Sequence, residues 1–427
     1  MRFNTLADWL RWQEQLHPNP VDLGLERVRR VLEAMQLERP AYQVLTVGGT
    51  NGKGSCVAFL DAMLRAQGYK AGAYTSPHLL RYNERVSIGG REVTDAELCE
   101  SFARVDAARG ATSLTYFEFG TLAALDIFRN HRIEVAVLEV GMGGRLDAVN
   151  AVDPLGALVV SIGLDHQEWL GPDRDSIGYE KAGIYRRGRP AICGDRDPPP
   201  RLLQTARQIG ADLQVLGRDF DWHAGHDGWD WQKGAAYIGN LPPPDIPGRI
   251  QYDNAASSIA LLQAVRAELA VSEAAIRKGL QRARISARFE RVPGEVELIF
   301  DVAHNQDAAR VLASNLDATR GTGRTIAVVG MYRDKAAGAV AQALGERIDS
   351  WHLGGLGGAR GQSAAELAAR VRSALPRAQL HAHASVIDAW QAAGADAARG
   401  DRIVIFGSFQ TVGAILRILR ESVTNVA

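Results

Sequence analysis

The chain repeats one local pattern, in which a short apolar run is followed by glycine or small polar residues and then by a helical stretch. The runs at 44–47, 71–74, 135–140 and 158–162 all end in this way. Short apolar runs are typical of buried strands, and their alternation with helices predicts an α/β fold with a mostly parallel sheet covered on both faces. Ligands of such sheets bind at the carboxyl ends of the strands, so the polar residues there are the first functional candidates.

The same pattern restarts near residue 287, after a tract that holds Trp222, Trp229 and Trp231 between proline clusters. We interpret the tryptophans as local core rather than as a platform for a ligand. We expect a P-loop domain over residues 1–286 and a smaller Rossmann-like α/β domain over residues 287–427. Expected strands of the second domain cover 296–302, 325–330, 349–353 and 402–406.

Composition excludes several other classes of protein. Lys+Arg and Asp+Glu are 49 each, so the chain lacks both the net charge of a disordered protein and the positive excess of a duplex-binding protein. Cys56, Cys99 and Cys193 are odd in number and widely spaced, which argues against a disulfide framework. With no secretory signal at the start and no apolar run long enough to cross a bilayer, we expect a cytoplasmic protein.

The most specific motif is a glycine-rich loop between an apolar run and a helical stretch, which is the context of a phosphate-binding loop. Backbone N–H groups, a helix N-terminus and a lysine together suit an anionic phosphate. The motif departs from the common P-loop pattern, because Val47 replaces the first glycine and Gly54 separates the lysine from the serine. The loop residues are Gly49, Thr50, Asn51, Gly52, Lys53, Gly54 and Ser55.

Together with this loop, a series of ordered motifs resembles the folylpolyglutamate synthase family, which is related to the Mur ligases. The resemblance extends along nearly the whole chain, and it points to the bacterial members that act on both dihydropteroate and folates. The matching motifs are 21–28, 49–55, 75–79, 81–86, 115–121, 138–148, 164–166, 180–184 and 300–305.

The resemblance implies an ATP-dependent ligase that joins a carboxylate to the amine of L-glutamate through an acyl phosphate. It implies 7,8-dihydropteroate and reduced folates as acceptors, ATP as co-substrate and two Mg²⁺ ions, and it leaves a monovalent cation open. It also implies a monomer with small-molecule substrates, without nucleic acid or membrane partners. The domains would then correspond to the central and C-terminal domains of Mur ligases, with ATP between them.

Three polar residues follow apolar runs and are expected to converge at one edge of the sheet: Ser76, Glu139 and His166. The resemblance assigns all three to Mg²⁺, and Glu139 and His166 also to catalysis. Taken singly, each has an ordinary structural alternative, such as a turn residue or a buried ion-pair partner. Lys181 resembles the family lysine that carries a carbamate, which requires a lowered pKa; a plain lysine near a helix start is its alternative.

The resemblance also carries over the contacts to the two larger substrates. We add Arg85 ourselves as a holder of the substrate carboxylate, with a surface salt bridge as its alternative, and a helix cap is the alternative for Asn254. The ATP contacts beyond the loop are Asn254, Arg288, Asp301 and His304. The acceptor contacts are Pro20, Val21, Asp22, Thr115, Tyr116, Phe117, Glu118, Leu146, Asp147 and Ala148.

Other functions stay open at this point. They include a monofunctional folylpolyglutamate synthase and another Mur-type amide ligase, although Mur ligases usually carry a separate domain before the phosphate loop. A nucleotide-dependent switch protein is a third alternative, but the sequence lacks the Asn-Lys pair that GTP switches use to read the base. The last is an inactive nucleotide- or folate-binding protein, which is disfavoured because every candidate metal position is filled.

Overall fold

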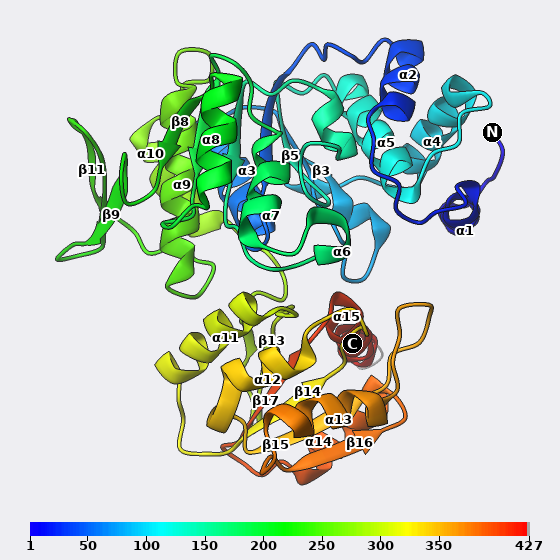
Figure 1. Ribbon diagram of the computed structural model, residues 1–427, viewed down its shortest axis with the longest axis vertical. Helices are drawn as coiled ribbons and strands as arrows, with labels where there is room; N and C mark the ends of the chain where they lie inside the picture. The colour runs from blue at the N-terminus through cyan, green and yellow to red at the C-terminus, as the bar shows by residue number, and fades with distance from the viewer. Residues whose placement is uncertain (425–427) are drawn as a thin grey trace. The chain divides into compact units, whose positions relative to one another are not determined.

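The computed structural model describes residues 1–424 and divides into two compact units, each of which is described by itself (Figure 1). The first unit contains Met1–His78, Tyr82–Asp245 and Gln251–Arg284. The second begins at Ile285 and also takes in two short earlier segments, Leu79–Arg81 and Ile246–Ile250.

The first unit is built on an eight-stranded sheet in the order β4-β3-β2-β5-β1-β6-β7-β8. The strands from β2 to β8 in this order run parallel, while β3 and β4 form an antiparallel edge beside β2. The fold class expected from the sequence is therefore confirmed. The strands are β1 Gln43–Gly48, β2 Ala71–Tyr74, β3 Val86–Ile88, β4 Arg91–Glu92, β5 Val135–Glu139, β6 Gly156–Val159, β7 Pro190–Cys193 and β8 Asp212–Val215.

Helices cover both faces of this sheet. Residues of α1, α2, α4, α5, α7 and α8 share one apolar cluster with the sheet. On the other face α10 packs on α3, and α9 lies against β6. The helical elements are α1 Leu6–Leu16, α2 Glu26–Met35, α3 Lys53–Gln67, η1 Tyr82–Arg85, α4 Asp95–Arg109, α5 Tyr116–Asn130, η2 Ala148–Ala151, α6 Gln167–Leu170, α7 Arg174–Ala182, α8 Pro200–Ile209, α9 Ile250–Ala264 and α10 Glu273–Arg282.

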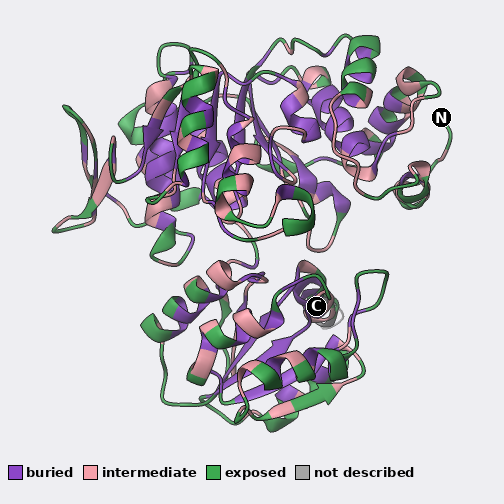
Figure 2. Ribbon diagram, in the orientation of Figure 1, coloured by how far each residue is buried: buried purple, intermediate pink, exposed green. Residues whose placement is uncertain are grey.

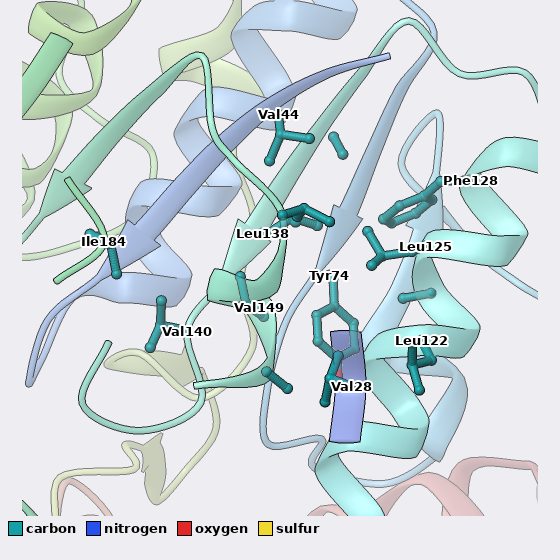
Figure 3. Packing of buried hydrophobic residues seen from close by; sticks show 14 of the residues in the cluster. Val28, Val44, Tyr74, Leu122, Leu125, Phe128, Leu138, Val140, Val149 and Ile184 are labelled. Atoms are coloured by element: carbon teal, nitrogen blue, oxygen red, sulfur yellow. The ribbon is translucent and has the colours of Figure 1, made fainter. Parts of the chain in front are cut away.

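The central strands are buried on both faces, which explains their unbroken apolar sequence. Every residue of β5 is buried, and so is every residue of β1 after Gln43. Figure 2 shows the strands buried while the outer faces of the helices are exposed. In Figure 3, Tyr74 of β2 lies beside Val28 of α2 and Leu122 of α5, so the sheet and two helices pack around one aromatic ring.

A three-stranded antiparallel sheet follows α8 and holds the tryptophan cluster. Its strands are β9 Asp221–Ala224, β10 Trp229–Lys233 and β11 Ala236–Leu241. Trp229 and Trp231 are 1% and 0% exposed, and the Trp231 indole donates to the Ala256 carbonyl of α9 at 3.1 Å. The interpretation of these two tryptophans as core is therefore confirmed.

The second unit is a six-stranded sheet in the order β12-β13-β17-β14-β15-β16, parallel except for β12. Helices α11, α12 and α13 pack on one face, and α14 and α15 on the other. The bounds are β12 Glu290–Val292, β13 Glu297–Phe300, α11 Gln306–Ala318, β14 Thr325–Val329, α12 Ala337–Leu344, η3 Gly345–Arg347, β15 Ser350–Gly354, α13 Ala364–Ala374, β16 Leu380–His383, α14 Val386–Asp396, β17 Arg402–Phe406 and α15 Phe409–Thr424.

One strand begins and ends earlier than the apolar run that predicted it. The run at 158–162 predicts a strand to Ile162, but β6 covers Gly156–Val159. The Val160 N–H still donates to the Gly48 carbonyl of β1, but the N–H groups of Ile162 and Gly163 bond to side chains. The Ile162 N–H donates to Asp195 at 2.8 Å, and the Gly163 N–H donates to Thr50 at 3.0 Å. Such long-range polar contacts are invisible in the hydrophobic pattern.

All three cysteines are free and buried. Burial raises the pKa of both the Cys56 and the Cys193 thiol to about 12, so these two thiols are neutral. Within residues 1–424, no helix combines the length and the apolar character needed to cross a bilayer.

We expect Phe102→Ala to destabilise the first unit strongly. Phe102 of α4 is fully buried, and its ring lies 5.5 Å from Phe119, 5.8 Å from Tyr82 and 5.9 Å from Trp9. Removing such a ring leaves a cavity, and the expected loss in free energy of unfolding is about 3–5 kcal/mol, measured by chemical denaturation. Tyr237→Ala, at an aromatic residue 60% exposed, is the control. A loss below about 1 kcal/mol for Phe102→Ala would contradict this packing.

Candidate functional site

The glycine-rich loop connects the end of β1 to the start of α3 and leaves the helix N-terminus without a side-chain cap. Gly52 is the N-cap residue, with a φ of 84° in the left-handed region. A Cβ at Gly52 would lie 2.8 Å from both the Asn254 amide oxygen and a Val160 methyl group, so both the conformation and the space require glycine. An uncapped helix N-terminus with close backbone access suits a phosphate group.

Hydrogen bonds fix this loop to the segment that follows β6. The Thr50 hydroxyl donates to the Gly163 carbonyl at 3.2 Å, and the Asn51 N–H donates to the Ser161 hydroxyl at 3.0 Å. The Lys53 ammonium donates to the Gly49 and Thr50 carbonyls at 3.0 and 3.2 Å, so its charge lies over the loop. These observations fit the loop to an anionic phosphate ligand such as the ATP that the sequence implies.

Ser76 and Glu139 are brought together at the carboxyl edge of the sheet because β2 and β5 are neighbours. The Ser76 N–H donates to a Glu139 carboxylate oxygen at 3.0 Å, and Glu139 is 4% exposed. A hydroxyl and a carboxylate are oxygen donors, which fits a hard cation such as Mg²⁺.

His166 lies further along the same edge, beyond β6. It is the N-cap residue of α6 with a φ of 52°, and its backbone N–H donates to Asp165 at 2.9 Å. In the described part of the chain, no group of three or more His, Cys, Asp or Glu side chains is arranged to hold a metal ion. The three candidate ligands Ser76, Glu139 and His166 suit Mg²⁺ in number, because this ion retains waters and binds substrate phosphates.

Lys181 is a buried lysine in the last turn of α7, not near a helix start, and it is 2% exposed. Burial and the nearby charge of Lys53 together lower the pKa of its amine to about 7, against the opposing effect of Asp165 and Asp147. The two lysines and the two aspartates therefore lie within electrostatic range of one another. A pKa near 7 makes a neutral, nucleophilic amine available, which carbamate formation requires.

Asp147 is a second buried ionisable group of this cluster. Burial raises the pKa of its carboxyl to about 7, although backbone N–H groups of Met142 and Val149 bond to it at 2.9 and 3.0 Å. The neighbouring Leu146 carbonyl accepts from the Gly24 N–H at 3.2 Å, while Ala148 begins η2. The segments expected to bind the acceptor, 20–22 and 146–148, therefore lie close together.

Asp22 and Glu118 both bind Arg27, a residue that our sequence reasoning did not identify. Arg27 donates to the Asp22 carboxylate at 2.8 Å and to the Glu118 carboxylate at 3.0 Å, and the His17 ring lies 3.4 Å from Asp22. Glu118 also forms a capping box with Thr115 at the start of α5. Arg27 lies five residues after Asp22 in the matching motif, and this pair of opposite charges was the signal available.

Aromatic rings line the neighbouring part of the site. Phe117 lies 5.9 Å from Tyr74, and a Cβ at Gly141 would lie 2.6 Å from the Phe117 ring, so this glycine makes room for it. Arg85 is buried, 8% exposed, and its guanidinium lies 5.2 Å from the Tyr82 ring and 5.6 Å from the Tyr116 ring. The surface salt bridge that we considered for Arg85 is therefore wrong.

Asn254 lies inside α9, so it is not a helix cap. It is 3% exposed, its amide donates to Gln251 at 2.9 Å, and it lies against Gly52 of the phosphate loop. The position places a buried amide beside the loop.

In the second unit, Asp301 and His304 lie just beyond β13, and Arg288 lies before β12. Burial raises the pKa of Asp301 while the charge of Arg288 lowers it, so these two side chains lie close together. Asp301 accepts from the backbone N–H groups of Phe289 and Ala303 at 2.9 and 2.8 Å. The His304 ring bonds to the Val302 carbonyl at 2.8 Å.

Comparison with known proteins identifies the family. Residues 287–409 match the family described as Mur ligase, glutamate ligase domain. A dihydrofolate synthase/folylpolyglutamate synthase of Escherichia coli (strain K12) is 43% identical over 414 residues, covering 97% of this chain and 95% of the relative. The protein of the same name from Haemophilus influenzae is 40% identical, covering 95% of this chain and 96% of the relative. The chain belongs to the dihydrofolate synthase/folylpolyglutamate synthase family.

Solved structures of this family share the fold of the whole chain. The E. coli FolC complex with DHPP and ADP has a TM-score of 0.93 at 42% identity and covers 98% of each chain. A bifunctional folylpolyglutamate synthase/dihydrofolate synthase with Mn, AMPPNP and L-glutamate bound has a TM-score of 0.89 at 44% identity, again covering 98% of each chain. The expected family and fold class are confirmed.

We expect Gly52→Ala to weaken nucleotide binding at least tenfold. The added methyl group would contact the Asn254 amide and Val160, and the left-handed φ of 84° is strained for alanine, so the loop must shift. A loss of about 1.4 kcal/mol or more in binding free energy corresponds to this change in Kd. Titration calorimetry with ATP measures it, and Gly321→Ala, which has open space and no left-handed φ, is the control. Equal affinity in both variants would show that the loop does not hold the phosphates.

Proposed function

We propose that this protein is an ATP-dependent ligase that adds L-glutamate to 7,8-dihydropteroate and to reduced folates. The observation that carries the proposal is the grouping of Lys53, Lys181, Asp147 and Asp165 beside an uncapped helix N-terminus. Bifunctional relatives at 43% and 40% identity favour both reactions over the monofunctional alternative, whose relative, the folylpolyglutamate synthase of Lacticaseibacillus casei, is 30% identical.

The reaction has two steps. An oxygen of the acceptor carboxylate attacks the γ-phosphorus of ATP, the bond to the bridging oxygen breaks, and ADP leaves with the bond electrons. The glutamate amine then attacks the acyl carbon of the acyl phosphate; the carbon–oxygen bond to phosphate breaks, and the amine loses a proton as the amide forms. Two anions must meet in the first step, so the protein has to position them and stabilise negative charge.

In the proposed assignment, residues 49–55 bind the phosphates of ATP, and the Lys53 ammonium offsets their charge. Ser76, Glu139 and His166 would hold Mg²⁺, which when bound would supply positive charge to offset the charge of the phosphates. The proposed catalytic role of Glu139 and His166 is to hold this ion. A carbamate on Lys181 would add a carboxylate-like group to the site. Asn254, Arg288, Asp301 and His304 are proposed further contacts of ATP.

The proposed acceptor site uses the carboxylates and the aromatic wall described above. Asp22 accepts hydrogen bonds from ring donors of the pterin, and Phe117 supplies an apolar surface. The other proposed members are Pro20, Val21, Arg85, Thr115, Tyr116, Glu118, Leu146, Asp147 and Ala148. Because Arg27 binds both Asp22 and Glu118, these two acids are held rigidly before the substrate arrives.

We further propose that the domains are residues 1–286, equivalent to the central ATP-binding domain of Mur ligases, and residues 287–427, equivalent to their C-terminal domain. The family match at 287–409 supports the second assignment. Three free cysteines suit a reducing cytoplasm. We also propose that the protein acts as a monomer and has no nucleic acid or membrane partner.

A phosphate-release assay tests the function. With ATP and Mg²⁺, we expect phosphate release that depends on both glutamate and dihydropteroate, and release that depends on both glutamate and tetrahydrofolate. Mass spectrometry of the products should show the acceptor plus one glutamate residue, because each turnover forms one amide. Folded, ATP-binding protein that gives no product with either acceptor would contradict the proposal, and product with tetrahydrofolate alone would favour the monofunctional alternative.

We expect turnover to depend on pH and on carbon dioxide through Lys181. Its pKa is lowered to about 7, so the amine is mostly protonated below that pH and cannot add carbon dioxide, whereas above it the neutral amine can. Rates should therefore fall below about pH 7 and rise on adding bicarbonate above it.

Lys181→Ala should lose nearly all turnover at every pH while retaining ATP binding. Lys278→Ala, at an exposed lysine of α10, is the matched control and should behave as the unchanged protein. Full activity of Lys181→Ala would rule out the carbamate.

A further inference from the structure

Arg85 is a buried cation that no acidic side chain of residues 1–424 pairs with. It ends η1 and is 8% exposed, and its hydrogen-bonding partners are neutral groups, the His78 ring and the Tyr74 hydroxyl. The flanking rings of Tyr82 and Tyr116 offset part of the cost of burying the charge through cation–π attraction. Burial of an uncompensated charge is costly, so the arrangement calls for an anion supplied from outside the chain.

His78 determines how the guanidinium is oriented. The Arg85 Nε–H donates to the His78 Nδ1 at 2.9 Å, so this ring nitrogen is an acceptor and the ring is neutral. With Nε engaged by His78 and two aromatic rings at the sides, the Nη edge, beside the Tyr74 hydroxyl, is the part of the guanidinium that can bind a carboxylate. A histidine at this position therefore directs the guanidinium rather than neutralising it.

The loop that carries His78 is rigidly joined to the proposed metal position. Thr75 bonds back to η1 twice, through its N–H to the Arg85 carbonyl at 2.9 Å and through its hydroxyl to the Glu84 carbonyl at 3.3 Å. In the same loop, the Ser76 N–H donates to Glu139. A carboxylate bound by Arg85 would therefore keep a fixed position relative to Ser76 and Glu139.

The location of Arg85 indicates which substrate supplies the anion. Tyr116, whose ring lies 5.6 Å from the guanidinium, belongs to the segment 115–118 that is proposed to bind the acceptor. The charges of Arg85 and Asp147 both act on the pKa of Tyr74. This tyrosine therefore lies near Arg85 and near the other acceptor segment, 146–148. The surroundings of Arg85 thus belong to the acceptor side of the site.

We propose that Arg85 binds a carboxylate of the acceptor and that His78 is the positioning residue that turns the Arg85 guanidinium toward it. The inference rests on the proposed function, of which it specifies one contact. The carboxylate is either the one that reacts or one on the glutamate tail of a folate, and both offer the same chemistry to the guanidinium.

The test compares His78→Leu with His78→Asn, whose amide oxygen can replace Nδ1 as the acceptor. His226→Leu, at a histidine whose side chain is 94% exposed, is the matched control. We expect His78→Leu to raise the KM for the acceptor by about tenfold or more, the range for one hydrogen bond to a charged group. His78→Asn should stay within about threefold of the unchanged protein. The KM values for ATP and L-glutamate should not move.

Varying dihydropteroate and tetrahydrofolate separately identifies the carboxylate. A raised KM for both acceptors assigns the reacting carboxylate, because dihydropteroate has no other; a rise with tetrahydrofolate alone assigns the tail. The proposal is overturned if His78→Leu leaves both acceptor KM values unchanged, if only the KM for L-glutamate rises, or if the asparagine variant is as impaired as the leucine variant. An unchanged melting temperature and ATP affinity show that each variant is folded.

If the unmodified protein gives no glutamate-dependent phosphate release, the proposed function fails. If it is active but His78→Leu behaves like His226→Leu, only the present inference fails.

Discussion

The proximity of two lysine charges, Lys53 and Lys181, is the constraint on which the candidate site depends. One charge lies over the phosphate loop, and the other amine is buried at the end of α7, where both burial and Lys53 lower its pKa to about 7. Two protonated lysines near each other repel, unless one amine loses its proton or a bound anion offsets their charge. The arrangement therefore favours a neutral or modified Lys181 together with bound phosphate, which is the state that phosphoryl transfer to a carboxylate requires.

The fold holds these groups in place through contacts that converge on the end of β6. Arg174, at the start of α7, donates to the Ile162 carbonyl at 2.8 Å and forms an ion pair with Asp195 at 3.2 Å. Asp195 in turn accepts from the Ile162 N–H. The phosphate loop bonds to the same segment through Thr50 and Asn51. Helix α7, which carries Lys181, and the phosphate loop are thus attached to one short stretch of backbone, and this limits their relative movement.

On the acceptor side of the site, neighbouring side chains fix the positions of the charged groups. Arg27 fixes Asp22 and Glu118, while Arg85 is supported by a neutral histidine and by aromatic rings. The charge of Arg27 is paired with carboxylates of the protein, and the charge of Arg85 is not. Of the two arginines, Arg85 is therefore the one that can bind an anionic group of a substrate.

Much of the fold could be predicted because its signals are local. The expected strands at 71–74 and 402–406 are β2 and β17, and the expected strand at 349–353 is β15 within one residue. Edge elements were missed for a physical reason. Strand β16, with the sequence LHAH, is at the edge of its sheet and only partly buried, so it has no apolar run to mark it.

The sequence by itself determined the α/β class, the phosphate loop and the family, since each depends on spacing along the chain or on ordered motifs. Only the tertiary structure decided that Lys181 is buried beside Lys53, that Arg27 joins Asp22 to Glu118, and that Arg85 pairs with His78 rather than with a surface acid. Burial and pairing depend on which distant segments the sheet order places side by side. That order follows from the packing of the whole unit and cannot be read from any one motif.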